Sequence, residues 1–404
     1  MLRFKKPDGS EYPDWKTIGF DDVMTIANGM VMPSDYPKLP HIGPGNIEKE
    51  TGRLLEYNLA EDDNLISGKY LFDEEDIIYG KINPQFAKVV LPGFKGLCSA
   101  DAYPIKASNG INPRFLFYVL LGKRFTQYAI SVSKRTGMPK INRDDLLRYN
   151  CKFPCIEEQQ KIADCLSSVD SVIADYEAQV ENMQNQKKGV MQKLFSQEVR
   201  FRADDGNKYP EWETPTLESI GSFYGGLSGK TKDDFGKGTG KFVTYMNVYK
   251  NTFASQEMLE AVDVGNKEHQ NTVSYGDILM SQSSETVEEV GLSSVYLYDD
   301  EPYLNSFCFG FSLNDLNMTY PQYMGYLMRS DAVRKQIMRE GQGISRINLS
   351  PNRIRNIKLS IPCLEEQQKI ADCLSAFDDT IEDLQKTVER WKNIKKGLLQ
   401  QLFA

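Results

Sequence analysis

The stretch EEQQKIADCLS occurs twice in this chain, at residues 157–167 and 365–375, without a single difference. A long internal repeat constrains the fold strongly, because each copy must be able to form the same structural unit. An apolar repeat could be two copies of a core strand. This one is polar and charged, so it predicts that both copies meet the same partner, or each other.

The repeat is wider than this stretch. RFKKPDGSEYPDWK (3–16) resembles RFRADDGNKYPEWE (200–213), and GMPKIN (137–142) resembles GISRIN (343–348). The Asp-Ile-Ile motif at 76–78 has its counterpart in the Asp-Ile-Leu motif at 277–279. Between such points the two halves differ almost completely. The chain is therefore one unit written twice, a variable domain followed by a constant tail, with predicted boundaries at 1–154, 155–198, 199–362 and 363–404.

The chain ends continue the same repeat. The middle of the chain reads Leu194-Phe195 and then Arg200-Phe201, while the C-terminus reads Leu402-Phe403 and the N-terminus Leu2-Arg3-Phe4. Joined together, the termini would recreate the internal junction. This predicts a quasi-circular molecule with pseudo-twofold symmetry and self-complementary contacts between its copies.

The tails have the pattern of long helices. Each contains no proline and one glycine over 156–195 and 364–403, and apolar residues recur in alternating steps of four and three. Lys187 and Lys395 fill the skipped positions, where they could reach solvent and help set the register. This heptad pattern predicts a coiled coil of helices about 60 Å long. The second helix can pack on the first only by running back, so we expect an antiparallel coil within one chain; a coil between two chains is the alternative.

The variable domains mix strand-like and helix-like segments. We predict strands at 76–81, 242–248, 277–280, 293–298 and 306–311, and helices at 113–124 and 321–339. We expect Tyr118, Tyr128, Tyr323 and Tyr326 to pack in the cores. The predicted fold class is mixed α/β, with two pseudo-symmetric globular domains separated by two long helices that form an antiparallel coiled coil.

Basic and amide residues cluster at equivalent places near the end of each variable domain. The net charge is −8, so a surface for nucleic acid must be local. Paired basic patches suit a polymer with regularly spaced phosphates, and Arg, Asn and Gln suit base edges. We therefore expect DNA-binding residues in the loops 133–142, 281–289 and 341–348 and in the adjoining helices: Lys134, Arg135, Lys140, Arg143, Gln282, Ser283, Ser284, Arg334, Lys335, Arg339, Gln342, Ser345, Arg346 and Asn348.

The polar face of each tail is a candidate docking patch for a protein partner. A solvated face tolerates drift, yet these residues are the same while the domains have diverged. The predicted patch consists of Glu157, Glu158, Gln159, Gln160, Glu365, Glu366, Gln367 and Gln368.

Residues for catalysis are difficult to find. Asn83-Pro84-Gln85-Phe86 resembles the (N/D)PP(Y/F) motif of amino-methylating enzymes but lacks its second proline, and the glycine-rich 236–240 precedes a strand instead of following one. We interpret both as turns. Seven cysteines without a CxxC pair and two histidines predict neither a zinc site nor a disulfide framework. With no signal sequence or apolar span, we expect a cytoplasmic protein with no metal, cofactor or membrane partner.

Taken together, the chain resembles the DNA-specificity subunit of type I restriction–modification systems. The IPxxEEQQKIAD-like segments (153–164 and 361–372), the KKGxxQxLF patterns (187–195 and 395–403) and the YPxW motifs carry this resemblance over the whole length. It implies two target-recognition domains that each read half of a split, asymmetric DNA sequence. It also implies helices that act as a spacer and dock two methylation subunits, through which restriction subunits join. The alternatives are a DNA adenine methyltransferase-like enzyme acting through Asn83-Pro84, and a coiled-coil scaffold that does not bind DNA.

Overall fold

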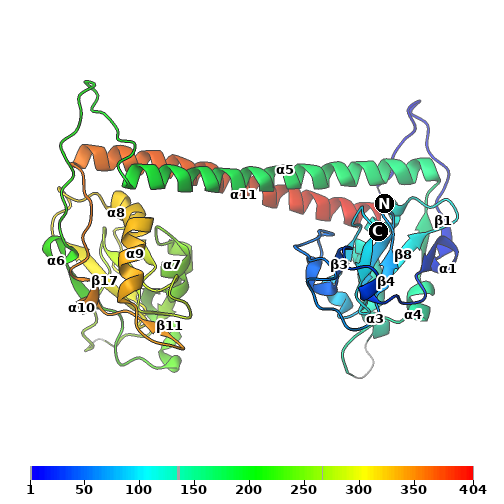
Figure 1. Cartoon of the computed structure of the whole chain (residues 1–404), viewed down its shortest axis with the longest axis horizontal. Coiled ribbons are helices and arrows are strands. Elements are labelled where there is room, and N and C mark those ends of the chain that lie inside the picture. Colours follow the sequence, from blue (N-terminus) through cyan, green and yellow to red (C-terminus); the bar gives the residue numbers. More distant parts are fainter. Residues whose placement is uncertain (1, 134–136, 266, 404) are drawn as a thin grey trace. The chain divides into compact units, whose positions relative to one another are not determined.

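The computed structural model describes residues 2–133, 137–265 and 267–403. Their contacts divide into two compact units, Met1–Glu177 with Gln385–Ala404, and Ala178–Leu384. Each unit contains one variable domain, one end of the long helix α5 (Ile156–Phe195) and the opposite end of the long helix α11 (Leu364–Leu402) (Figure 1).

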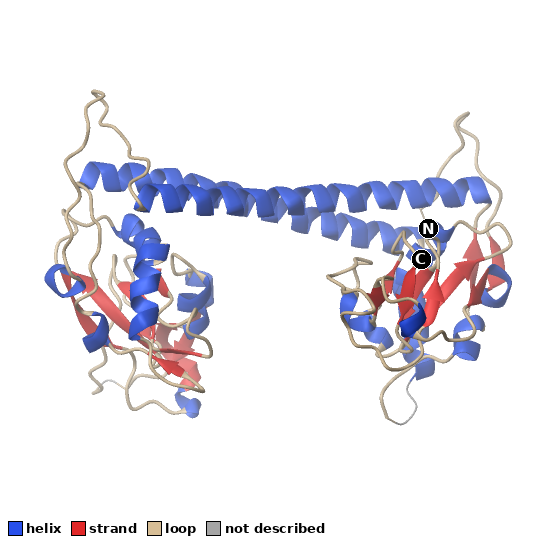
Figure 2. Ribbon diagram, viewed as in Figure 1, coloured by secondary structure: helices blue, strands red, loops and turns tan. Residues whose placement is uncertain are grey.

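The domain of the first unit contains three small sheets, whose strands are red in Figure 2. The largest is antiparallel, with the order β2-β8-β5-β6 (Met24–Ile26, Ala102–Ala107, Ile77–Gly80, Val89–Val90). A second has the order β3-β7-β4 (His41–Ile42, Gly96–Cys98, Tyr70–Phe72). The third pairs β1 with β9 (Lys16–Gly19, Asn150–Phe153).

The second unit repeats this plan. Its four-stranded antiparallel sheet has the order β10-β17-β13-β15 (Gly221–Gly225, Cys308–Leu313, Ile278–Ser281, Ser293–Val295). A three-stranded sheet has the order β12-β11-β16 (Leu259–Val262, Phe235–Val243, Tyr303–Leu304), and β14 pairs with β18 (Ser283–Ser284, Ile347–Asn348). In each main sheet the strand that begins at the first isoleucine of the Asp-Ile motif, β5 or β13, is fully buried, because it lies between two neighbouring strands and is covered by helices.

Each main sheet is covered by a pair of consecutive helices, α2 and α3 (Pro113–Leu121, Lys123–Ser133) in the first unit and α8 and α9 (Pro321–Met328, Asp331–Glu340) in the second. We predicted one continuous helix in each place; both are interrupted, at Gly122 and at Arg329-Ser330. Short helices complete the domains: α1 (Phe20–Val23), α4 (Arg143–Leu147), α6 (Leu217–Ile220), α7 (Tyr245–Lys250) and α10 (Pro351–Ile354). Tyr118, Tyr323 and Tyr326 are buried, as predicted, and Tyr128 is partly buried.

Two further predictions about the second domain are wrong. The predicted strand 242–248 ends at Val243, because the Thr244 side chain accepts a hydrogen bond from the Asn247 backbone N–H and caps helix α7. The glycine-rich 236–240 forms part of β11 and is not a turn outside the sheet. Gly236 and Gly238 have positive φ there, and the pairing register with β12 shifts across this stretch.

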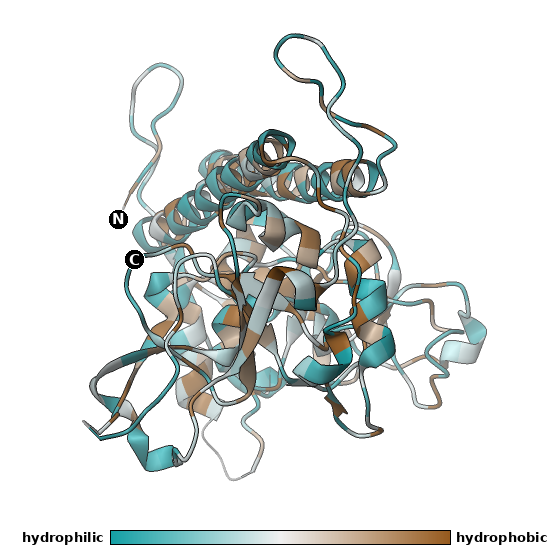
Figure 3. Cartoon of the chain, turned by 90° about the vertical axis from the view of Figure 1, so that its left-hand side faces the viewer, coloured by the Kyte–Doolittle hydropathy of each residue, from teal (hydrophilic) through white to brown (hydrophobic). Residues whose placement is uncertain are grey.

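The long helices run antiparallel in both units, as the heptad pattern predicted. In the first unit, Leu398 and Leu402 near the end of α11 pack in one core with Ile162 and Leu166 near the beginning of α5. In the second unit, the same core holds Leu194 of α5 together with residues Ile370 and Leu374 of α11. The predicted seam positions are buried or half-buried, and most positions between them are exposed. Both hydrophilic and hydrophobic residues are present on the long helices in Figure 3.

We expected the lysines at the skipped heptad positions, Lys187 and Lys395, to reach solvent, but both are largely buried in ion pairs. Lys395 is only 8% exposed, and its Nζ lies 2.6 Å from Asp170 of α5, which also accepts a hydrogen bond from the Tyr118 hydroxyl. In the second unit, Lys187 pairs with Asp378 at 2.5 Å, and Asp378 accepts from Tyr326. Each lysine therefore joins the two helices to the domain beside them.

The chain ends meet in the first unit as the repeat predicted (Figure 1). The Leu2 backbone N–H donates to the Gln401 carbonyl at 2.8 Å. The Phe403 ring lies 5.6 Å from the Phe115 ring, and at the internal junction Phe195 lies 5.7 Å from Tyr323, the counterpart of Phe115. The termini thus reproduce the contacts of the continuous chain.

Two buried carboxyls occupy equivalent places before the central strands. Asp277 accepts hydrogen bonds from the Tyr224 hydroxyl at 2.6 Å and from the Ser274 backbone N–H at 2.8 Å. Burial still raises the pKa of Asp277, as it does that of Asp76 in the first unit. A raised pKa means that the folded protein binds this proton more tightly than the unfolded chain.

We therefore expect Asp277→Asn to change how stability depends on pH. The aspartate favours folding at low pH, and this contribution is lost as the pH rises from about 4 through the raised pKa. The free energy of unfolding of the variant minus that of the wild type should thus increase with pH between about 4 and the raised pKa, and stay constant above it. Urea unfolding at a series of pH values measures this difference. The exposed Asp299→Asn is the control, and a difference independent of pH for Asp277→Asn would contradict the prediction.

Candidate nucleic-acid interface

Two polar loops of the second unit, far apart in sequence, are joined by backbone hydrogen bonds. Ser283 of β14 pairs with Asn348 of β18, and the Leu349 backbone N–H donates to the Gln282 carbonyl at 2.8 Å. Gln342 and Asn348 exchange two backbone hydrogen bonds of 2.9 and 2.7 Å, which close the turn between them. The predicted loops 281–289 and 341–348 therefore form one surface, which we call the loop surface of the second unit.

The first unit has the same construction. After β5, the Ile141 backbone N–H donates to the Lys81 carbonyl at 3.0 Å, and the Asn83 N–H donates to the Pro139 carbonyl at 2.8 Å. Lys140 forms an antiparallel bridge with Ile82 and is exposed. Predicted residues Lys134 and Arg135 lie outside the described part of the chain.

Most predicted DNA-binding residues of the second unit are exposed. On the loop surface, Ser283 is half-exposed, and the side chains of Gln282, Gln342, Ser345, Arg346 and Asn348 are exposed. Lys335 and Arg339 are exposed on the neighbouring helix α9. This set combines cations for phosphate with amide and guanidinium groups that suit the edges of bases.

The loop surface is mixed in charge, not purely basic. Glu285 and Glu288 are exposed on the same loop as Gln282. The Tyr245 hydroxyl, which donates to the Ser283 carbonyl at 2.8 Å, has a pKa raised mainly by burial, with Arg346 lowering it. Carboxylates accept hydrogen bonds from cytosine, so such a mixture fits selective reading of bases better than uniform attraction to phosphate.

Three predicted DNA-binding side chains instead hold the fold together. Arg334 is buried and donates through Nη2 to the carbonyls of Glu288 and Val290, at 2.9 and 2.7 Å, and burial lowers its pKa to about 10. Arg143 is half-buried and donates to the Ala27 carbonyl at 2.6 Å. Ser284 is buried and donates to the Thr286 carbonyl. The structure therefore argues against Arg334 and Ser284 as direct DNA contacts, because both side chains are buried and donate to loop carbonyls.

The repeated EEQQ segment binds its own domain through its two middle residues. In the first unit, the buried Glu158 accepts hydrogen bonds from Arg3 at 2.9 Å and from the Trp15 ring N–H at 3.0 Å. Gln159 donates to the Pro154 carbonyl and accepts from the Asn112 backbone N–H. The YPxW motif and the helix start are thus one hydrogen-bonded unit.

The second unit repeats these contacts with the corresponding residues. Glu366 accepts from Arg200 at 2.7 Å and from the Trp212 ring N–H at 3.0 Å, and Gln367 accepts from the Tyr320 backbone N–H at 2.8 Å. Both side chains are fully buried. The prediction that Glu158, Gln159, Glu366 and Gln367 face a protein partner is therefore wrong, and their repetition reflects a repeated internal anchor.

The outer residues of the same segments remain accessible. Glu157, Gln160, Glu365 and Gln368 are exposed, in the same pattern in both copies. Gln160 also accepts a hydrogen bond from the Asn112 side chain at 2.7 Å. These four positions are the part of the predicted docking patch that a partner could reach.

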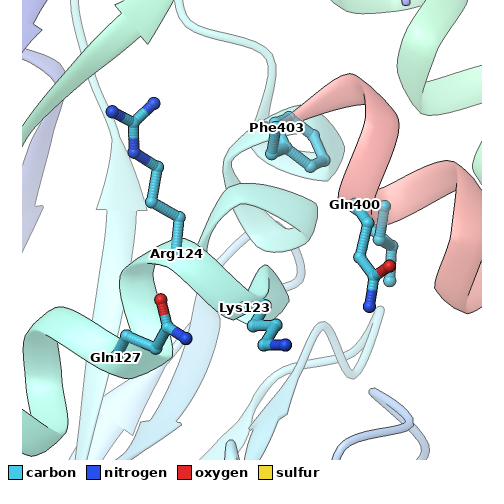
Figure 4. A pocket seen from close by; sticks show the side chains of 6 residues that line it. Lys123, Arg124, Gln127, Gln400 and Phe403 are labelled. Atoms are coloured by element: carbon cyan, nitrogen blue, oxygen red, sulfur yellow. The ribbon is translucent and has the colours of Figure 1, made fainter. Parts of the chain in front are cut away.

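A cavity of about 360 Å³ lies in the first unit between α3 and the end of α11 (Figure 4). Lys123, Arg124 and Gln127 line it from α3, opposite Gln400 and Phe403. At the matching place in the second unit, Gln192 donates to Asp331 at 2.9 Å. The start of the second covering helix is therefore basic in the first unit, with Lys123 and Arg124, and acidic in the second unit, with Asp331.

The motif that suggested a methyltransferase forms a tight turn. Asn83 has a left-handed backbone with φ of 51°, and Pro84–Phe86 is a single 3-10 turn, in agreement with our interpretation.

Within the residues that the structure describes, no cluster of three His, Cys, Asp or Glu side chains could hold a metal ion. No described helix is long and apolar enough to cross a membrane.

Comparison with known sequences identifies a family. The pattern of the type I restriction modification DNA specificity domain matches residues 12–183 and again 209–390. The EcoDI specificity subunit of Escherichia coli is 33% identical over 212 residues, which span 51% of this chain and 47% of that protein. The MjaVIII specificity subunit of Methanocaldococcus jannaschii is 25% identical over 417 residues, covering 99% and 95% of the two chains.

Solved structures share the fold. A chain from a study of complex assembly and conformational transition of the type I R-M system aligns with a TM-score of 0.61 at 15% identity, covering 97% of this chain and 98% of that one. The S subunit of a type I restriction–modification system from M. genitalium aligns with a TM-score of 0.55 at 15% identity, covering 97% and 96%.

Proposed function

Because this chain belongs to the type I restriction–modification DNA specificity family, we propose that each of its variable domains reads one half of a bipartite, asymmetric DNA sequence. The domains extend over 1–154 and 199–362, and the helical segments 155–198 and 363–404 form the spacer. The chain is a recognition subunit and not a catalyst; methylation and cleavage belong to other subunits.

The repeated construction of the loop surface carries this proposal. Both copies use the segment after the central strand, paired with the GMPKIN or GISRIN turn, but the exposed side chains differ, with Lys140 in one copy and Arg346 in the other. Equal scaffolds with different side chains suit two readers of different sequences. A target read by such a pair is not a palindrome.

The side chains of the second copy divide between two roles. In this proposal Arg346 recognises guanine, and Gln282, Gln342 and Asn348 recognise adenine, with Ser283 and Ser345 as adaptable donors. Lys335 and Arg339, on helix α9, bind phosphate and set the position on the duplex. In the first copy, Lys140 takes the place of Arg346, and the predicted contacts Lys134 and Arg135 precede it in the sequence.

The outer residues of the EEQQ segments complete the proposal. Glu157, Gln160, Glu365 and Gln368 offer the same exposed groups at two equivalent places, which fits the binding of two copies of one partner. That partner is the methylation subunit, and restriction subunits join through it. The assembly acts on double-stranded DNA in the cytoplasm.

We expect Arg346→Ala to alter recognition of the second half-site alone. In the complex with methylation subunits, it should weaken binding by about 1–3 kcal/mol and relax the preference at one base pair. Arg339→Ala is the matched control, and should weaken binding equally for all sequences and reduce the salt dependence. Mapping methylated adenines in DNA from cells that carry each variant measures the base preference, and DNA binding at a series of salt concentrations measures the affinity and its salt dependence. The proposal would be contradicted if Arg346→Ala relaxed the base preference in the first half-site, or if it left the preference in both half-sites unchanged.

A further inference from the structure

The GISRIN turn of the second unit (343–348) and the GMPKIN turn of the first unit (137–142) each expose one apolar side chain. Ile344 is fully exposed, at 103%, and Met138 at the equivalent position of the first unit is 65% exposed. Isolated exposed apolar residues are common and require no explanation. Two of them at the same place in domains whose other sequence has diverged point to a shared task.

The turn that presents Ile344 is rigidly built. Gly343 has a φ of +133°, and a Cβ there would lie 1.8 Å from the Arg346 carbonyl oxygen, so the turn requires glycine. The Gln342–Asn348 hydrogen bonds close it, and Ile347 is buried beneath it. In the first unit, Gly137 also has positive φ, and Ile141 is buried. One isoleucine therefore anchors each turn, and the apolar residue three positions earlier projects from it.

Polar and cationic residues belong to the same turns as the projecting side chains. Gln342, Ser345 and Arg346 are exposed near Ile344 in the chain, and the exposed Lys140 lies two residues after Met138 in the first copy. Phe307, whose carbonyl accepts from the Gln282 N–H, is 59% exposed on the same surface. An apolar tip on a surface of amides, cations and a few carboxylates fits DNA, whose phosphates flank an apolar stack of bases, better than it fits the apolar centre of a protein interface.

Resting on the proposed function above, we propose that Ile344 and Met138 are wedges that enter the stack of base pairs in their half-sites. Isoleucine and methionine are among the side chains that proteins insert between base steps. Contact with a thymine methyl group in the groove would require the same base at the same place in both half-sites. A wedge needs no particular base, which explains why the apolar character is shared while the neighbouring readers differ.

The test uses the full chain in complex with its methylation subunits. The duplex carries the target determined by methylation mapping, with 2-aminopurine at successive positions of the second half-site other than the methylated adenine, which methyltransferases rotate out of the stack. This base fluoresces more strongly when it is unstacked. Wild-type complex should raise the fluorescence at one step. Ile344→Ala should remove most of that rise and weaken binding about tenfold, as expected for losing a buried apolar side chain.

Two variants serve as matched controls. Ile344→Met introduces the side chain of the other copy and should retain the rise in fluorescence. Met318→Ala removes a side chain of the same unit that is 63% exposed and lies outside the loop surface, and it should leave fluorescence and affinity unchanged. Met138→Ala should act only when 2-aminopurine is placed in the first half-site.

The outcomes separate this inference from the proposed function. If the wild-type complex binds its target but Ile344→Ala leaves the fluorescence rise intact, the wedge is overturned and sequence reading by the domains stands. Weaker binding without a fluorescence change also overturns it, in favour of packing within a groove. Failure of the wild-type complex to prefer any sequence overturns the proposed function itself.

Discussion

Replacing Glu366 with alanine is expected to destabilise the second unit by about 3 kcal/mol, because removing one member of a buried ion pair leaves its partners uncompensated. The fully buried Glu366 carboxylate accepts from Arg200 and from the ring N–H of Trp212, which is itself buried. The hydrogen bond to Glu366 raises the pKa of Arg200, and this stabilisation is lost in the variant. The guanidinium still stays charged without its partner, because arginine is not deprotonated at ordinary pH. In calorimetry of the full chain, the Tm of the affected transition should fall by roughly 6–12 °C.

The neighbouring residue supplies the control for this experiment. Glu365 is identical in chemistry but exposed, so Glu365→Ala should change the free energy of unfolding by less than about 0.5 kcal/mol. Glu158→Ala and Glu157→Ala repeat the comparison in the first unit, where Glu158 is the buried member. Arg200→Ala combined with Glu366→Ala should destabilise by less than the sum of the two. If Glu365→Ala and Glu366→Ala change the free energy of unfolding equally, the hydrogen bonds of Glu366 to Arg200 and Trp212 do not explain why the segment is repeated.

The second large effect is expected at the lysine in the helix seam. Asp170→Ala should lower the free energy of unfolding by about 2–3 kcal/mol, because it leaves the buried Lys395 without its carboxylate and the Tyr118 hydroxyl without its acceptor. The lysine would retain its hydrogen bond to the Thr51 carbonyl at 2.7 Å, which limits the loss. Urea unfolding of the full chain measures the change.

Replacing both members of this pair distinguishes stability from register. Because an apolar pair avoids the desolvation of buried charges, Asp170→Leu with Lys395→Leu should recover most of the loss. The double variant should however specify the helix register less well, as expected when the polar residue of a seam is removed. Asp175→Ala, exposed on the same helix, is the control. If Asp175→Ala lowers the free energy of unfolding as much as Asp170→Ala, the ion pair between Asp170 and Lys395 does not account for the loss.

Periodic and repeated features were predictable because they depend on residues close together in the chain. The proline-free stretches with heptad spacing, 156–195 and 364–403, agree with α5 and α11 to within one residue, although the predicted helical segments 155–198 and 363–404 extend up to three residues further. The direction of the helices followed from the need of each apolar stripe for a partner. The interruption of the helix pairs at Gly122 and Ser330 was missed, because the apolar pattern continues across both breaks.

Which polar residues are accessible was not predictable. Glu157 and Glu158 are adjacent and chemically the same, yet one is exposed and the other buried against Arg3 and Trp15. Arg334 and Arg346 both belong to the basic cluster, but only Arg346 is exposed. The fixed pairing of the YPxW motif with each EEQQ segment in both copies was the signal that could have located the anchor.

The sequence by itself determined that this protein is a duplicated unit with two variable domains and two antiparallel helices, because identical segments and a seven-residue period need no knowledge of distant contacts. Only the tertiary structure decided that half of the repeated polar segment is internal. It also decided that two loops some sixty residues apart form a single surface with an apolar tip. The physical reason is that burial and hydrogen-bond pairing of a side chain depend on what distant segments bring beside it, and composition does not record this.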